Sequence, residues 1–309
     1  MRIALATFLL VLVGAPAASA YPWPVRPFNA QHAVRGNFDD PRALRGYVDD
    51  TWDNPLSFHS GIDIQAPDGT PVYAVAPGQV TFPSREAVAV ATPAATFFAP
   101  LVFGYWHVVP AVRPLQHVAR GQLIGFVRPD AGHVHVSEKR YGVYVNPLRR
   151  GGIAPYRDTV PPVIDGLVFY RCGTATELRS DVVNGCIDLA VDAYDPPPIP
   201  PTPPWHDVVL SPTHIGWSGL FEGAWQPVAY RADDVDFTRL LTIPLTDVYA
   251  PGTRLNGPNV RGDYRFWLAR SVDTTLLEDG LHTISVTASD IRGNTITTAL
   301  QFTVANAQG

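Results

Sequence analysis

The segment FHSGIDIQAPDGTPVYAVAPGQV, residues 58–80, alternates short apolar runs with turn-forming residues. Pro67-Asp68-Gly69 and Pro77-Gly78 are turn signals, which is typical of β-strands joined by tight turns. The pattern extends from Asp53 to Asn146, and no part of it shows a convincing apolar period of 3.6 residues. This region is therefore predicted to be an antiparallel β domain. The strand candidates are residues 72–76, 80–82, 88–91, 101–109, 123–127 and 133–137.

The same segment holds two candidate metal ligands, His59 and Asp63, with Gly61 between them to let the backbone turn. An imidazole nitrogen and a carboxylate oxygen both bind first-row metals, and together they suit Zn²⁺. A second pair follows at His133 and His135. Residues i and i+2 of a strand face the same side, about 7 Å apart, so both imidazoles are predicted to enter one space.

The two histidines of the second pair need not both bind one ion. One can be a ligand while the other lies outside the coordination shell of the metal and transfers a proton. Two histidines and one aspartate would leave the fourth zinc position to water, which is the open arrangement of a catalytic site. The residue pattern thus favours a catalytic metal over a closed structural one.

These motifs resemble those of the lysostaphin-type (LytM-like) zinc endopeptidases. The resemblance rests on His59-x-x-x-Asp63, on APDGTPVYA at residues 66–74 and on His133-x-His135. It covers roughly residues 22–147, including GQLIG at residues 121–125 before the second motif and NPL at residues 146–148 after it. Two motifs in this order, about 70 residues apart, form a far more specific signal than either motif alone.

The resemblance implies that three residues bind Zn²⁺ and that two act on protons and oxyanion without binding it: His59, Asp63 and His135 for the metal, His107 and His133 for catalysis. His107 ends the short motif Tyr105-Trp106-His107, an aromatic residue, one further residue and a histidine, as in the family. His117 lies ten residues further on, where the family has a connecting turn. It is therefore expected outside the site.

The activity implied by the resemblance is hydrolysis of peptide bonds in bacterial peptidoglycan. Zinc would polarise the scissile carbonyl and lower the pKa of its water, while a histidine takes the proton. One alternative is a non-catalytic module of the same fold that binds peptidoglycan or regulates a hydrolase. Another is a β-rich adhesion or carbohydrate-binding protein whose functional part is the second domain. In that case the order of the His and Asp motifs would be a coincidence.

Residues 1–20 have the three parts of a secretory signal peptide. Arg2 supplies the positive charge, residues 3–13 are apolar, and Ala18-Ser19-Ala20 is a small-residue cleavage site. The apolar run is too short for a comfortable membrane span, and no later segment is long enough to be one. The mature protein is therefore expected to begin near Tyr21 and to be secreted or periplasmic. An uncleaved membrane anchor is the alternative.

Charge and cysteine content narrow the protein class further. The net charge is −5 and the arginines are scattered, which argues against a nucleic-acid partner because such proteins carry a basic stripe. The two cysteines, Cys172 and Cys186, are predicted to form a disulfide in an exported chain. Closing a loop of about 15 residues would stabilise the fold by roughly 3 kcal/mol in the chain-entropy model.

The remaining chain of about 290 residues is long enough for two domains. We expect a peptidase domain over residues 21–150, a linker over 151–162 and a second β domain over 163–305. Apolar residues alternate in three predicted strands of the second domain, residues 187–193, 284–288 and 296–304. Seven or eight such strands favour an immunoglobulin-like sandwich. The predicted fold is thus all-β, an antiparallel sandwich or barrel followed by an immunoglobulin-like sandwich.

The run PPPIPPTPP at residues 196–204 cannot be a central strand, because proline donates no ladder hydrogen bond. We interpret it as a polyproline II excursion from a surface loop, with docking to an aromatic groove as the less favoured alternative. The second domain as a whole is expected to position the enzyme on a wall polymer or a partner protein, or to act as a spacer.

Overall fold

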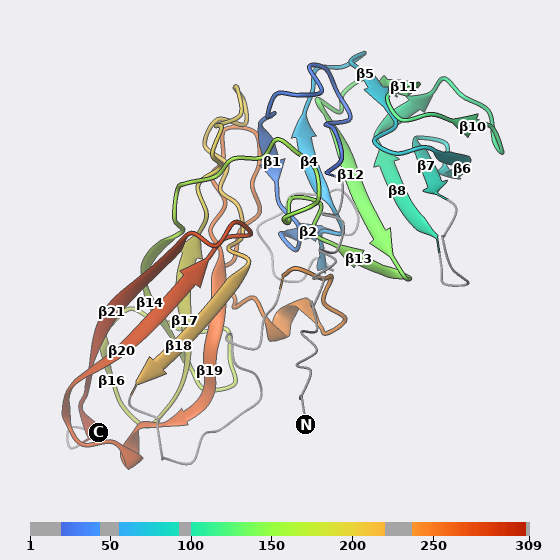
Figure 1. Cartoon of the computed structure of the whole chain (residues 1–309). Coiled ribbons are helices and arrows are strands. Elements are labelled where there is room, and N and C mark those ends of the chain that lie inside the picture. Colours follow the sequence, from blue (N-terminus) through green and yellow to red (C-terminus); the bar gives the residue numbers. More distant parts are fainter. Residues whose placement is uncertain (1–19, 44–55, 93–99, 220–236, 307–309) are drawn as a thin grey trace, which may run out of the picture.

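The computed structural model describes residues 20–43, 56–92, 100–219 and 237–306. Residues 1–19, most of the predicted signal peptide, lie outside the described residues. Two β-rich lobes lie side by side, one coloured blue to green and the other yellow to red (Figure 1). No helix within the described ranges is long and apolar enough to cross a membrane. The prediction of an all-β fold is confirmed.

The first domain is built on an eight-stranded sheet in the order β1-β4-β12-β8-β7-β6-β10, with β13 paired to β12. Its strands are β1 (Val34–Gly36), β4 (Ile62–Gln65), β6 (Gly78–Ser84), β7 (Ala87–Thr92), β8 (Leu101–Trp106), β10 (His117–Val118), β12 (His133–Arg140) and β13 (Val143–Val145). A second sheet of order β5-β11-β9 contains β5 (Pro71–Tyr73), β11 (Leu123–Val127) and β9 (Val108–Pro110). A short pair joins β2 (Pro41–Ala43) to β3 (Leu56–Phe58). One apolar core takes side chains from both larger sheets, as in a sandwich.

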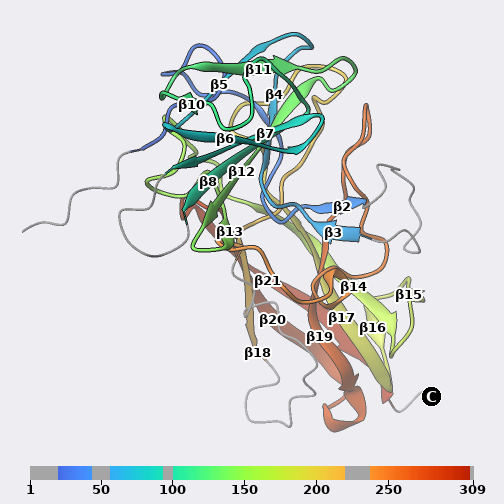
Figure 2. The same cartoon turned by 90° about the vertical axis from the view of Figure 1, so that its right-hand side faces the viewer.

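The second domain consists of two four-stranded sheets (Figure 2). One has the order β15-β14-β17-β19, with β15 (Glu177–Leu178), β14 (Val163–Arg171), β17 (Cys186–Tyr194) and β19 (Arg265–Asp273). The other has the order β16-β21-β20-β18, with β16 (Val182–Val183), β21 (Thr295–Val304), β20 (Gly280–Ser289) and β18 (His214–Gly219). Two short 3-10 helices, η2 (Leu245–Asp247) and η3 (Thr274–Leu276), complete the described elements. Side chains of both sheets share one core, so this domain is a sandwich. Its immunoglobulin-like class remains a prediction.

The predicted disulfide between Cys172 and Cys186 is present. It joins the end of β14 to the start of β17, and it therefore lies wholly within the second domain.

One predicted strand is interrupted. Residues 101–109 were expected to form a single strand, but they divide at His107 into β8 and β9, which belong to different sheets. His107 has a backbone φ of 64°, in the left-handed region that non-glycine residues seldom occupy. The kink redirects the chain from one sheet to the other. Apolar alternation does not reveal such a break, because the residues on both sides of it remain β-forming.

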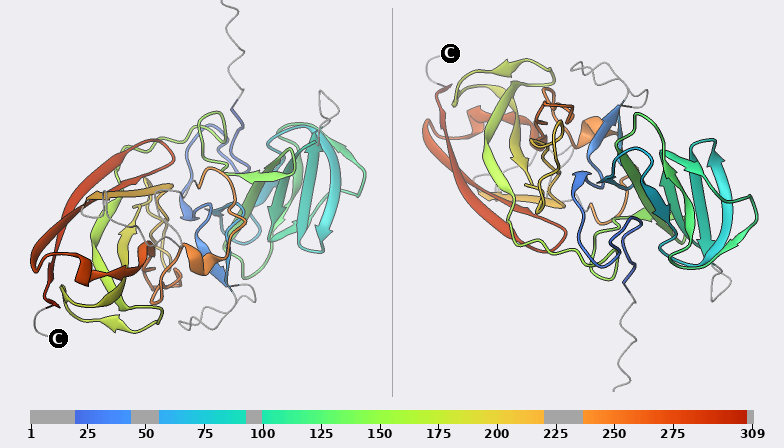
Figure 3. Two further views of the ribbon diagram at one scale, coloured as in Figure 1. Left: turned by 90° about the horizontal axis from the view of Figure 1, so that it is seen from below. Right: turned by 90° about the horizontal axis from the view of Figure 1, so that it is seen from above.

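The two domains are in direct contact (Figure 3). The backbone N–H of Ser211 donates to the buried carboxylate of Asp40 at 2.8 Å, and the Tyr249 hydroxyl donates to the carbonyl of Asp39 at 3.0 Å. The segment between the domains also packs on the first one, since Ile153 forms a bridge with Tyr21 and belongs to the first core. The second domain is thus held against the first close to β2.

Candidate metal centre

Strand pairing brings the second motif next to the first. In the antiparallel pair of β12 and β4, His135 lies opposite Asp63. On its other edge β12 pairs with β8, where His135 lies opposite Trp106, the residue before His107. His59 directly follows β3, and two residues separate it from the start of β4. The register of these strands therefore places all five predicted site residues around one point of the sheet.

Three donor atoms converge there. His59 Nε2 lies 2.7 Å from His135 Nδ1, and each of these nitrogens lies 3.2 Å from Asp63 Oδ1. Zinc bonds of about 2.0–2.2 Å would put tetrahedral ligands roughly 3.3 Å apart. The three residues are each less than a tenth exposed and already face one another at nearly that spacing. Their donor set therefore fits a zinc ion.

The tautomer of His59 suits a ligand. Its Nδ1 lies 2.6 Å from the carbonyl oxygen of Asn37, and a carbonyl only accepts, so this nitrogen carries the proton. Nε2 is then left with a lone pair directed at the other two donors. Burial, reinforced by the charge of Arg42, lowers the pKa of His59 to about 4. The imidazole is therefore neutral at pH 7, as metal binding requires.

The carboxylate of Asp63 is held by a charged partner. Arg42 Nη2 donates to Asp63 Oδ2 at 3.2 Å, which leaves Oδ1 directed at the two histidines. Burial alone would raise the pKa of Asp63, but His59 and His133 beside it hold the pKa well below its usual range. Asp63 is therefore ionised and oriented before any metal binds.

His133 and His107 lie beside the donor set. Their ring centroids are 4.4 Å apart, and His133 Nε2 lies 3.6 Å from Asp63 Oδ1. His133 Nδ1 lies 2.7 Å from the Ala131 carbonyl oxygen and 2.6 Å from Arg35 Nη2, while Nε2 faces the pocket. Burial, with the positive charge of Arg35, lowers the pKa of His133 to about 3. Burial also lowers the pKa of His107. Both imidazoles are therefore neutral near pH 7.

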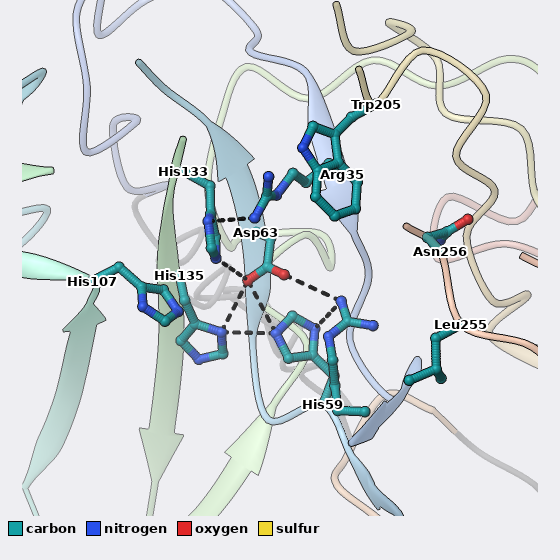
Figure 4. A pocket seen from close by; sticks show the side chains of 10 residues that line it. Arg35, His59, Asp63, His107, His133, His135, Trp205, Leu255 and Asn256 are labelled. Carbon is teal, nitrogen blue, oxygen red and sulfur yellow. Dashed lines mark hydrogen bonds and ion pairs between the residues drawn. The ribbon is translucent and has the colours of Figure 1, made fainter. Parts of the chain in front are cut away.

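The five residues line one pocket of about 360 Å³ (Figure 4). The pocket is completed by Arg35 and Arg42 of the first domain and by Trp205, Leu255 and Asn256 of the second. The Arg35 guanidinium lies 4.0 Å from the centre of the Trp205 ring and 2.6 Å from His133 Nδ1. Both domains thus form walls around the histidines.

The other histidines named in the sequence lie elsewhere. His117 is exposed on β10, at the far edge of the eight-stranded sheet, and does not line the pocket. The Pro196–Pro204 run is mostly exposed, as expected of a surface loop, but it also contacts the first domain. Gln65 and Thr202 exchange hydrogen bonds of 2.8–3.1 Å across the two domains.

Sequence reasoning missed three pocket residues that act on the histidines. Arg35 and Arg42 belong to neither metal-binding motif, and Trp205 is only the residue after the proline run. Arg42 is 17 positions from His59, and Arg35 is 170 positions from Trp205. No local spacing connects them. A signal that could have drawn attention to Trp205 is its position at the end of a stiff run.

Comparisons with known proteins agree with the motif pattern. The model of peptidase family M23 matches residues 57–147, which include all five predicted site residues. No curated protein matches the chain.

Solved structures similar to the chain include a zinc-containing peptidase from Vibrio cholerae (21% identity, TM-score 0.33), of which the chain spans 39% while using 42% of its own length. The catalytic domain of the prophage-encoded M23 protein EnpA from Enterococcus faecalis shows 26% identity over 42% of this chain and 98% of that one, with a TM-score of 0.29. The catalytic domain of lysostaphin from Staphylococcus simulans shows 15% identity over 43% of this chain and 87% of that one, with a TM-score of 0.25.

The family match covers the segment in which the sequence motifs, the strand register and the converging donor atoms coincide. The resemblance to lysostaphin-type peptidases is confirmed. Residues 57–147, the part of the first domain that holds both motifs, match peptidase family M23.

Proposed function

We propose that the chain is an exported zinc-dependent endopeptidase that hydrolyses peptide bonds of bacterial peptidoglycan. The observation that carries the proposal is the convergence of three ligand atoms beside two neutral histidines in an open pocket. The substrate class rests on the resemblance of the two motifs to lysostaphin-type endopeptidases. The disulfide supports an oxidising compartment, in keeping with the predicted signal peptide.

In this proposal His59, Asp63 and His135 hold the zinc ion. Zinc bound there would supply Lewis acidity toward the peptide carbonyl and make water acidic enough to attack it near neutral pH. Asn37 and Arg42 orient His59 and Asp63 through the contacts described above, so the ligands need little rearrangement.

His133 is the proposed general base. In the tautomer that donates Nδ1–H to the Ala131 carbonyl, its Nε2 faces the pocket without a proton. It can take a proton from the attacking water and pass it to the leaving amine. His107 lies against the same face and is proposed to steady the negative charge that develops on the carbonyl oxygen.

Arg35 would limit the lifetime of protonated His133. Its guanidinium lies 2.6 Å from His133 Nδ1, and the repulsion between two cations favours return of the proton to the leaving group. The pocket thus contains a base that is neutral before the reaction and is not trapped as a cation during it.

The test combines metal content with cleavage. Protein beginning at Tyr21 is purified, its zinc is measured, and it is incubated with peptidoglycan sacculi while free amines are counted. We expect one zinc per chain and release of new amino groups, with both lost in His135→Ala. Zinc binding without amine release would instead support the alternative, a module that binds peptidoglycan or regulates a hydrolase. Absence of zinc from the wild-type protein would contradict the metal assignment.

A further inference from the structure

A second group of acidic side chains lies where the second domain meets the segment that precedes it. Asp158 belongs to that segment, Asp195 follows β17, and Asp290 begins the turn between β20 and β21. One carboxylate oxygen from each lies within 4.8 Å of the other two. Their exposed fractions are 8%, 2% and 5%. None of the three lines the pocket that contains the histidines.

The three carboxylates have no ion-pair partner among the described residues. No described Lys, Arg or His nitrogen lies within 4.0 Å of their oxygens. Arg292, the nearby cation, lies over the Tyr156 ring at 4.9 Å from its centre. Buried charges in proteins are normally paired or coordinate a metal. Burial and the charges of Asp158 and Asp290 raise the pKa of Asp195 well above its usual range.

Asp195 is the member whose side chain makes no hydrogen bond. Asp158 accepts from the Val160 N–H at 3.0 Å, and Asp290 accepts from the Asn294 N–H at 2.9 Å. Asp195 Oδ1 is fully buried and has no hydrogen-bond partner. Its backbone is fixed by reciprocal hydrogen bonds of 2.7 and 2.8 Å with Leu210, so the side chain is held in place. A buried carboxylate oxygen left unpaired in this way is open to a ligand such as a cation or water.

We propose that Asp158, Asp195 and Asp290 bind a calcium ion. The donors are carboxylate oxygens only, which hard cations prefer, whereas zinc favours nitrogen and sulfur. Calcium accepts six to eight oxygens in flexible geometry, so backbone carbonyls and water can complete the shell. Magnesium demands near-ideal octahedral geometry and keeps several waters, which suits a buried trio of carboxylates less well.

The position of the site gives the ion a structural role. Asp158 follows Tyr156, whose ring belongs to the core of the first domain, while Asp195 and Asp290 belong to the second. Calcium would therefore fasten the interdomain segment to the second domain. Asp195 also begins the proline run that leads to Trp205. The same ion would fix the base of the loop that forms one wall of the histidine pocket.

The experiment uses the chain from Tyr21 onward, freed of metal by chelation and then reloaded with one equivalent of zinc. Calcium chloride is titrated calorimetrically, and thermal unfolding is followed with and without calcium. We expect one calcium per chain, with a dissociation constant on the order of 10⁻⁴–10⁻³ M or below, and a melting temperature that rises with calcium. Asp195→Asn and Asp158→Asn should each lose this response.

Two controls separate this site from others. Asp165→Asn removes an exposed carboxylate that pairs with Arg261 at 3.7 Å, and it should keep the calcium response. His135→Ala should also bind calcium, which distinguishes this site from the zinc site. Without calcium, Asp195→Asn should melt no lower than the wild type, because it removes a buried charge that the neighbouring carboxylates repel.

The proposal is overturned if the wild type binds no calcium up to about 10 mM, ten times the weak end of the extracellular range. In that case the three carboxylates share protons and hold no ion. It is equally overturned if Asp195→Asn and Asp158→Asn both bind calcium as tightly as the wild type.

Discussion

The side chains around the proposed zinc ligands favour neutral histidines. Arg42 and Arg35 each place a guanidinium within 3.2 Å of an imidazole nitrogen, of His59 and His133 respectively. Their charges act in the same direction as burial, which lowers the pKa of His59 to about 4 and that of His133 to about 3. His59 and His133 thus stay free of extra protons, which would compete with the metal.

At the same scale, His133→Ala should keep its zinc and lose most of its cleavage. His133 donates no ligand atom to the converging set, yet its Nε2 faces that set at 3.6 Å from Asp63 Oδ1. Loss of a general base costs about 10²–10⁴-fold in rate. His107→Ala should show a loss of similar size, since a single oxyanion donor contributes comparably. Zinc content and turnover on sacculi are measured for each variant.

His117→Ala is the matched control for these two variants, because His117 is exposed on β10 and outside the pocket. It should behave as the wild type. If His133→Ala loses its zinc, the two histidines of β12 have been assigned in the wrong order.

The residues that bear the proposed chemistry could be predicted from the sequence, whereas those that tune them could not. His59, Asp63, His133 and His135 stand in two short motifs whose order is specific. Arg42 contacts Asp63 across 21 positions of sequence, and no local pattern connects the two residues. An arginine at an unremarkable spacing is normally a solvated surface residue, so the half-buried position of Arg42 beside the site had no sequence signal.

At the scale of elements, alternation predicted where strands lie but not how their edges meet. Residues 133–137 were predicted to form a strand, and the structure continues this strand, β12, beyond Ser137 to Arg140. The division of residues 101–109 at His107 was not predicted, since a left-handed residue leaves no periodic trace. This break gives His107 its place beside His133, so the least predictable backbone feature bears on the site.

The turn between β3 and β4 gives a second prediction. A Cβ atom at Gly61 would lie 2.7 Å from His135 Nε2 and would overlap the carbonyl of Val136. Gly61→Ala should therefore displace the His135 ring and weaken zinc binding at least tenfold, with an overpacking cost of about 1–3 kcal/mol in stability. Competition with a fluorescent zinc chelator measures the affinity, and thermal unfolding measures the stability.

Gly166→Ala is the corresponding control. A Cβ at Gly166 meets no heavy atom within 4 Å, and the residue lies in β14 of the second domain. It should leave zinc affinity unchanged. Wild-type zinc affinity in Gly61→Ala would show that the ring tolerates the added methyl group and that the turn does not position the ligand.

At the scale of the whole molecule, the second domain is more than a spacer at the pocket. Trp205, Leu255 and Asn256 form the wall opposite the β12 histidines, and the Arg35 side chain lies between Trp205 and His133 (Figure 4). The sequence predicted two β domains but not this contact, because β alternation describes each sandwich without saying which loops face the neighbour. The contact depends on long-range pairs such as Arg35 and Trp205.

The last prediction follows from that wall and rests on the proposed peptidase activity. Trp205→Ala should raise KM for a peptidoglycan peptide about tenfold, equivalent to 1.4 kcal/mol of lost binding, while kcat changes by less than about threefold. The reason is that Trp205 contributes an aromatic surface and holds Arg35 by a cation–π contact, but supplies neither a ligand nor a proton acceptor. Steady-state kinetics on a soluble muropeptide separates the two constants, and zinc content should stay at one per chain. His206→Ala, which changes the exposed neighbour paired with Asp207, should leave both constants unchanged. An unchanged KM in Trp205→Ala would exclude Trp205 from substrate binding, and a fall in kcat as large as that of His133→Ala would place Trp205 in the positioning of the base instead.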